Sequence, residues 1–155
     1  MRYARLILVL AALAATLCAA DDPFVGTWKL NLAKSDYKTG GAPMEQIATI
    51  TVSSGEMTVH VAAVNADGRK TLVYYSIPYK GGFGKMSEPS PAYDNISGTQ
   101  ISLYEREITR WKDGKGVFTA HSVVAPDGKT MATISKGISP QGKPVQASIW
   151  YDRIK

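Results

Sequence analysis

The sequence predicts an all-β protein, an antiparallel up-and-down meander barrel of about 8–10 strands. Two observations lead to this fold class. Helical periodicity is almost absent after Asp22, and short runs of alternating apolar and polar residues recur between glycine-containing turns. Asp-Gly pairs in these turns tolerate the positive φ that tight hairpins require. Closure of a meander removes its exposed edges, so we expect a barrel; a sandwich of the same strands is the alternative.

The first twenty residues differ from the rest of the chain. Arg2 and Arg5 precede an apolar run, residues 6–20, which ends in small residues. This run is too short for a membrane span, which needs about 20 residues. We interpret residues 1–20 as a secretory signal peptide and residues 21–155 as one exported domain, periplasmic or secreted.

Removal of the signal peptide changes the composition of the domain. The net charge falls by two, from +5 to +3, and the single cysteine, Cys18, is lost. A mature domain without cysteine excludes disulfide scaffolds, thiol catalysis and Cys-ligated metal sites. A lipoprotein acylated at Cys18 is the alternative, although bulky Leu17 is unsuited to the position before an acylated cysteine. Lysine and arginine are scattered, which does not indicate a nucleic-acid partner.

The expected strands follow one another along the mature chain. Within them, for example, Met57, Val59 and Val61 alternate with Thr58 and His60, so one face of each strand is apolar and the other is mixed. The expected ranges are 26–30, 46–52, 57–64, 71–79, 100–111, 116–124, 129–136 and 144–153, with one or two short strands possible between 83 and 97.

Two segments depart from the meander. Residues 31–43 are polar and include two adjacent glycines, so we expect a long connection there. Residues 85–98 are the most irregular stretch of the mature chain and are a candidate for a mobile rim or lid.

The stretch Gly26-Thr27-Trp28 resembles the opening of calycin barrels, the group of lipocalins, fatty-acid-binding proteins and avidins, which share Gly-x-Trp on the first strand. The resemblance implies that Trp28 closes one end of the barrel and that Arg153, on the last strand, stacks on it. Nearly the whole mature chain is also similar to small exported bacterial lipocalin-like proteins of unsettled function. They share the opening Gly-Thr-Trp-Lys-Leu-Asn and close with Pro-Asp-Gly-Lys-Thr-Met and Gln-Gly-Lys-Pro-Val, here residues 126–131 and 141–145.

The chain departs from the fatty-acid-binding pattern at its end. Those proteins hold the lipid carboxylate with Arg-x-Tyr; here Tyr151 matches the tyrosine, but Ile149 stands where the arginine would be. Residues 31–45 are also too short and too rich in Gly and Pro for the two-helix lid of that family. We therefore do not expect a fatty acid anchored in that way, while a neutral or differently held apolar ligand remains open.

Alternation around Arg106 identifies the strongest polar candidate. Glu105 and Glu107 share one face of a strand and Arg106 lies on the other. Strand carboxylates two residues apart are typical of a solvated outer face, which would place Arg106 inside the barrel. A buried arginine is costly unless paired, so Arg106 is a candidate anchor for an acidic ligand group. By the same alternation, Tyr104 is expected on the same face of the strand as Arg106.

Histidine and tyrosine supply the other candidates. His60 and His121 are the only histidines, and each lies on an expected strand. Facing inward, they can donate to a ligand or join a carboxylate to bind a metal, and a hydrogen-bonded strand histidine is the alternative. Tyrosine, with an apolar body and a polar tip, suits a pocket wall. The predicted ligand-binding residues are Arg106, Tyr104, Tyr74, His60, His121 and Tyr151; no catalytic residue, metal or cofactor is predicted.

These features predict a non-enzymatic exported protein that holds a small apolar or amphipathic molecule inside the barrel, with no nucleic-acid partner and no membrane span after signal cleavage. The sequence contains no Gly-x-Ser-x-Gly, His-Glu-x-x-His or phosphate loop. Two alternatives remain open. One is an isomerase, cyclase or hydrolase that uses a pocket histidine with a tyrosine. The other is a filled barrel that acts as an interaction module, which a cavity no larger than roughly 300 Å³ would favour.

Overall fold

The computed structural model describes residues 22–87, 92–139 and 142–155, and the regular structure within them is entirely β-strand. The predicted signal peptide lies outside the described residues. In the part described, no helix is long and apolar enough to cross a membrane. The strands are β1 (Gly26–Leu30), β2 (Asp36–Thr39), β3 (Glu45–Ser53), β4 (Glu56–Val64), β5 (Lys70–Pro78), β6 (Gly81–Phe83), β7 (Lys85–Met86), β8 (Asn95–Ser102), β9 (Glu105–Lys112), β10 (Lys115–Val124), β11 (Thr130–Ile138) and β12 (Pro144–Arg153).

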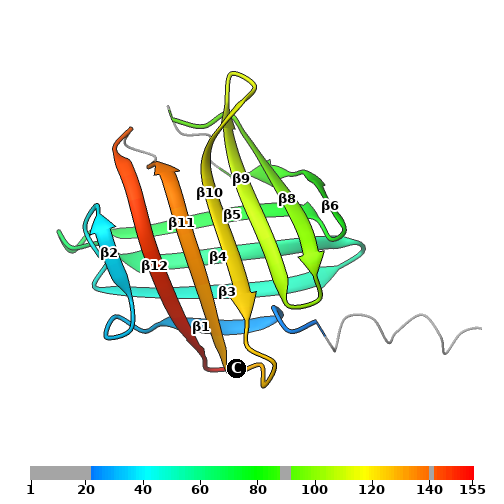
Figure 1. The fold of residues 1–155 in the computed structure, drawn as a ribbon, viewed down its shortest axis with the longest axis horizontal. Coiled ribbons are helices and arrows are strands. Elements are labelled where there is room, and N and C mark those ends of the chain that lie inside the picture. Colours follow the sequence, from blue (N-terminus) through cyan, green and yellow to red (C-terminus); the bar gives the residue numbers. More distant parts are fainter. Residues whose placement is uncertain (1–21, 88–91, 140–141) are drawn as a thin grey trace, which may run out of the picture.

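The strands form one antiparallel sheet that curls into a nearly closed barrel, which confirms the predicted fold class. The order is β6-β8-β9-β10-β11-β12-β1-β3-β4-β5-β7, and β2 pairs with β12 beside this path. In Figure 1, β8 to β12 cross in front of β3, β4 and β5, so the barrel has two crossing walls. The first strand joins the last: Trp28 of β1 lies opposite Arg153 of β12.

The remaining seam, between β5 and β8, is bridged by one short segment. β6 pairs with β8 and β7 pairs with β5, so residues 81–86 pass from one wall to the other. Two glycines make this crossing compact. A Cβ at Gly84 would lie 2.0 Å from the carbonyl oxygen of Ser76, and a Cβ at Gly98 would lie 2.2 Å from Cδ1 of Ile77. Side-chain packing therefore closes the seam between β5 and β8, where few backbone hydrogen bonds connect the strands.

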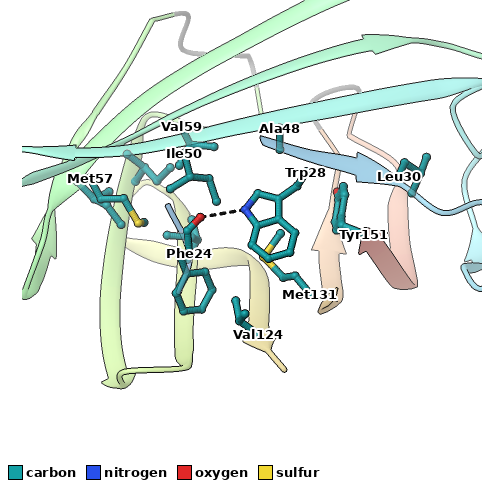
Figure 2. Packing of buried hydrophobic residues seen from close by; sticks show 13 residues of the cluster. Phe24, Trp28, Leu30, Ala48, Ile50, Met57, Val59, Val124, Met131 and Tyr151 are labelled. Carbon is teal, nitrogen blue, oxygen red and sulfur yellow. Dashed lines mark hydrogen bonds between the residues drawn. The ribbon is translucent and has the colours of Figure 1, made fainter. Parts of the chain in front are cut away.

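One end of the barrel is filled by an aromatic core. Trp28 is fully buried, and its Nε1 donates to the carbonyl oxygen of Phe24 at 2.9 Å (Figure 2). The Arg153 guanidinium lies 4.3 Å from the centroid of the Trp28 ring and donates to the carbonyl oxygens of Pro23 and Val25. The contact that the resemblance implied is present, and Arg153 also ties the segment before β1 to the last strand.

The strand boundaries differ from expectation in two places. The single strand expected over residues 100–111 is two strands, β8 and β9, joined by a turn at Leu103 and Tyr104. The sequence gives no Gly or Pro signal for this turn, and a register shift between Gln100 and Ser102 precedes it. The expected long connection over 31–43 contains β2. Between residues 83 and 97, where one or two short strands were expected as possible, the structure has β7 and the start of β8. Positions 88–91 of the candidate lid lie outside the described residues.

Candidate functional site

A partly open cavity of about 230 Å³ lies inside the barrel, between the two crossing walls. Strands β3, β4, β5, β9, β10, β11 and β12 line it with side chains from their inward faces. Its wall is mainly apolar, with aliphatic and thioether groups that include Ile50, Met57, Val59, Ile108, Met131 and Ile149. Such a lining, with a few polar groups, is typical of sites for small organic molecules.

The volume limits what the cavity can hold. About 230 Å³ is below the roughly 300 Å³ at which pockets for drug-sized ligands begin. It exceeds the roughly 150 Å³ of an engineered cavity that binds benzene, a molecule of six non-hydrogen atoms. Scaled in proportion, the space fits a molecule of about nine non-hydrogen atoms.

Hydrogen-bonded polar groups interrupt the apolar wall. Tyr151, a predicted site residue, lines the cavity, and its hydroxyl accepts a hydrogen bond from Gln46 Nε2 at 2.7 Å. Burial raises the pKa of Tyr151, so the phenol stays neutral. On the same wall, in β10 and β11, the hydroxyls of Ser122 and Thr133 lie 2.8 Å apart. These groups offer both donors and acceptors to a ligand.

Arg106 lies inside the barrel, as the alternation with Glu105 and Glu107 predicts, and it is 3% exposed. Its charge is already balanced, because Nη2 lies 2.9 Å from Oδ2 of the buried Asp22. Nη1 donates to the carbonyl oxygen of Tyr79 at 2.9 Å. Arg106 therefore fastens the N-terminal segment into the barrel, and the geometry does not leave it free to anchor an acidic ligand.

Sequence reasoning missed Arg110, which follows Arg106 by four residues on the same face of β9 and lines the cavity. Three aromatic rings surround its guanidinium. The distances from Cζ to the ring centroids are 4.8 Å for Phe118, 5.3 Å for Tyr93 and 5.9 Å for Tyr75. Among the described residues it has neither an ion pair nor a hydrogen-bond partner. The alternation that places Arg106 inside places Arg110 inside as well, so the sequence did contain this signal.

Two of the predicted site residues meet each other on the outside of the barrel. Val59, Val61 and Tyr75 line the cavity, so His60 and Tyr74 point outward from β4 and β5. Their rings contact edge to face, with centroids 4.7 Å apart. This pair is not part of the cavity.

His121 and Tyr104 also lie outside. Nε2 of His121 is 2.8 Å from Glu105 and Nδ1 is 3.8 Å from Glu107, on the outer face of β9 and β10. Tyr104 is 38% exposed because the turn between β8 and β9 breaks the alternation that would have placed it beside Arg106. The enzyme alternative needs a histidine in the barrel, and neither histidine lies there.

No family model matches this chain, and no curated protein matches it. Among the residues that the structure describes, no group of three or more His, Cys, Asp or Glu side chains could hold a metal ion. As far as the described residues show, the cavity offers one cation without a counterion, Arg110, together with a few hydroxyl and amide groups and an apolar interior.

Proposed function

We propose that this protein is an exported, lipocalin-like member of the calycin group, which binds a small apolar or amphipathic molecule in its barrel without transforming it. The cavity carries this proposal, because it is mainly apolar and has hydrogen-bonding groups at few positions. The Gly-x-Trp opening and the Trp28–Arg153 contact support the family assignment.

The size of the cavity sets the expected affinity. Small ligands gain from about 0.3 to at most about 1.5 kcal/mol per non-hydrogen atom. A ligand of about nine such atoms then binds with a Kd in the micromolar to millimolar range, because only the best small ligands approach the upper limit. Compounds with one ring, or with a chain of about eight carbons, suit the space.

The proposal is tested with the mature chain and a panel of such compounds. Calorimetry and the NMR signals of Tyr75 and Tyr151 report binding, since both rings line the cavity; Trp28 does not line it and is a poor reporter. Ala120→Leu should fill part of the cavity and weaken binding at least tenfold. Ala62→Leu is the matched control, because Ala62 is exposed on β4. Circular dichroism verifies that both variants fold. If no compound binds and native mass spectrometry detects no retained molecule, the proposal is overturned.

A second candidate function is a filled barrel that works through its outer surface. The cavity volume, below roughly 300 Å³, favours it. Exposed apolar side chains near the turn between β8 and β9, Ile101 at 50% and Leu103 at 47%, offer contact surface for a partner. Failure of the whole compound panel, with a folded protein, would favour this candidate.

A further inference from the structure

We infer that the ligand is a small monoanion and that Arg110 binds its anionic group, an inference that rests on the proposed function. The observation behind it is the contrast between the two arginines on the inward face of β9. Arg106 is paired with a buried carboxylate, whereas Arg110 has aromatic neighbours and no carboxylate among the described residues.

The surroundings of Arg110 suit an incoming anion. A partly buried guanidinium has lost part of its hydration, and three aromatic faces restore only part of that loss. A carboxylate would add two parallel charge-assisted hydrogen bonds in the fork geometry of arginine. The rings also restrict the guanidinium, so that less side-chain entropy is lost when the anion binds.

No acidic group on the neighbouring strand competes for this position. Asp94 immediately precedes β8, whose Ile96 lies opposite Arg110. The Asp94 carboxylate is held instead by the backbone N–H of Asp113 at 2.8 Å and lies 3.9 Å from Lys112 Nζ. Among the described residues no carboxylate pairs with Arg110, so its guanidinium can interact with a ligand in the cavity.

Of the two tyrosines beside Arg110, Tyr75 can complete the anion subsite. Burial raises the pKa of Tyr75 and Tyr93, and the charge of Arg110 acts in the opposite direction on both. Both phenols are therefore neutral near pH 7. The Tyr93 hydroxyl already donates to the carbonyl oxygen of Ile138 at 2.7 Å. The Tyr75 hydroxyl has no hydrogen-bond partner among the described residues and can donate to the anion.

The position of Arg110 orients the ligand. Arg106 and Arg110 are four residues apart, which corresponds to about 13 Å along a strand. Arg106 lies at the end closed by Phe24, and Ile108 lies between the two arginines. The anionic group is held at Arg110, and the apolar body extends along Ile108 toward Met57.

Matched ligand pairs test this inference. Benzoate and benzamide have the same shape and the same number of non-hydrogen atoms, about nine as the cavity requires, and differ in charge. Octanoate and octanamide form the aliphatic pair. In whichever of the two pairs fits the cavity, we expect calorimetry near pH 7 to show that the carboxylate binds at least tenfold more tightly than its amide. Arg110→Gln should remove this preference, weakening the acid at least tenfold and the amide by a much smaller factor.

Two further variants complete the experiment. Arg110→Lys keeps the charge without the fork and should retain part of the preference. Arg69→Gln is the matched control, because Arg69 is an exposed arginine paired with Asp67 in the turn before β5. Equal binding of acid and amide, or an acid preference that survives Arg110→Gln, overturns the inference while the proposed function stands. If only neutral compounds bind, the inference is likewise overturned and the proposed function stands. If nothing binds, the proposed function fails, and the inference fails with it.

Discussion

Removal of either partner of the buried Asp22–Arg106 ion pair should strongly destabilise the barrel. The two side chains are 0% and 4% exposed, and their closest atoms lie 2.9 Å apart. In Arg106→Met, the Asp22 carboxylate stays buried without its counterion, and the carbonyl oxygen of Tyr79 loses its donor. Loss of one partner from such a pair costs about 3–5 kcal/mol of unfolding free energy. For a domain of this size the melting temperature should fall by roughly 10–20 °C.

The assay is urea unfolding followed by tryptophan fluorescence, since Trp28 is fully buried in the folded state. Asp22→Asn should also destabilise the protein, because the Arg106 charge is then uncompensated. The double variant should lose at least about 1 kcal/mol less than the sum of the single variants, because the two groups interact directly. Glu45→Gln is the matched control: it breaks an exposed pair with Lys29 and should cost about 0.5 kcal/mol or less. Single losses no larger than that of the control, or strict additivity, would refute the reasoning.

Three other predictions concern the seam, the closed end and the response to alkali. Gly84→Ala should cost about 3 kcal/mol or more in urea unfolding, because its Cβ meets β5 backbone, whereas Gly41→Ala, whose Cβ has 3.9 Å of clearance, should cost under about 1 kcal/mol. Arg153→Met should lower the melting temperature by roughly 10 °C, through loss of the contact with Trp28 and of donors to three backbone carbonyls; an unchanged temperature would contradict this role. Burial raises the pKa of Tyr37 to about 12, so this group should not alter the free energy of unfolding below about pH 10 and should lower it as the pH rises toward about 12, because the phenol ionises first in the unfolded chain. Among the described residues the buried hydroxyl of Tyr37 has no hydrogen-bond partner, so Tyr37→Phe should unfold at the same or higher urea concentration near pH 7 and show a smaller alkaline loss.

The fold could be predicted because its signals are local. Alternation identified the faces of the strands, and the glycine turns separated most of them. Glu105 and Glu107 share the outer face of their strand, and this correctly indicated that Arg106 lies inside. The turn between β8 and β9 was missed because Leu103 and Tyr104 carry no turn signature. The resulting error in register wrongly assigned Tyr104 to the inner face of the strand, beside Arg106.

The site was harder to predict because its decisive contacts are distant in the chain. Asp22 and Arg106 are separated by 84 residues, and no local pattern connects them. For His60 and Tyr74, the alternation with Val59, Val61 and Tyr75 already indicated the outer face, and their selection as site residues rested on chemistry alone. Arg110 was overlooked although it repeats the register of Arg106, since only the structure shows which of the two guanidinium groups has no carboxylate partner within the described part of the chain.

The pairing of β1 with β12 has a consequence for the order in which the molecule folds. The chain is synthesised from its N-terminus, yet Trp28 finds its strand partner 125 residues later, at Arg153. Chains dominated by such distant contacts fold in milliseconds to seconds, because a long loop must close first. Until β12 arrives, β1 and β11 each present an open edge that can pair with another chain. A chain truncated before Pro144 should therefore aggregate and should not form a smaller barrel.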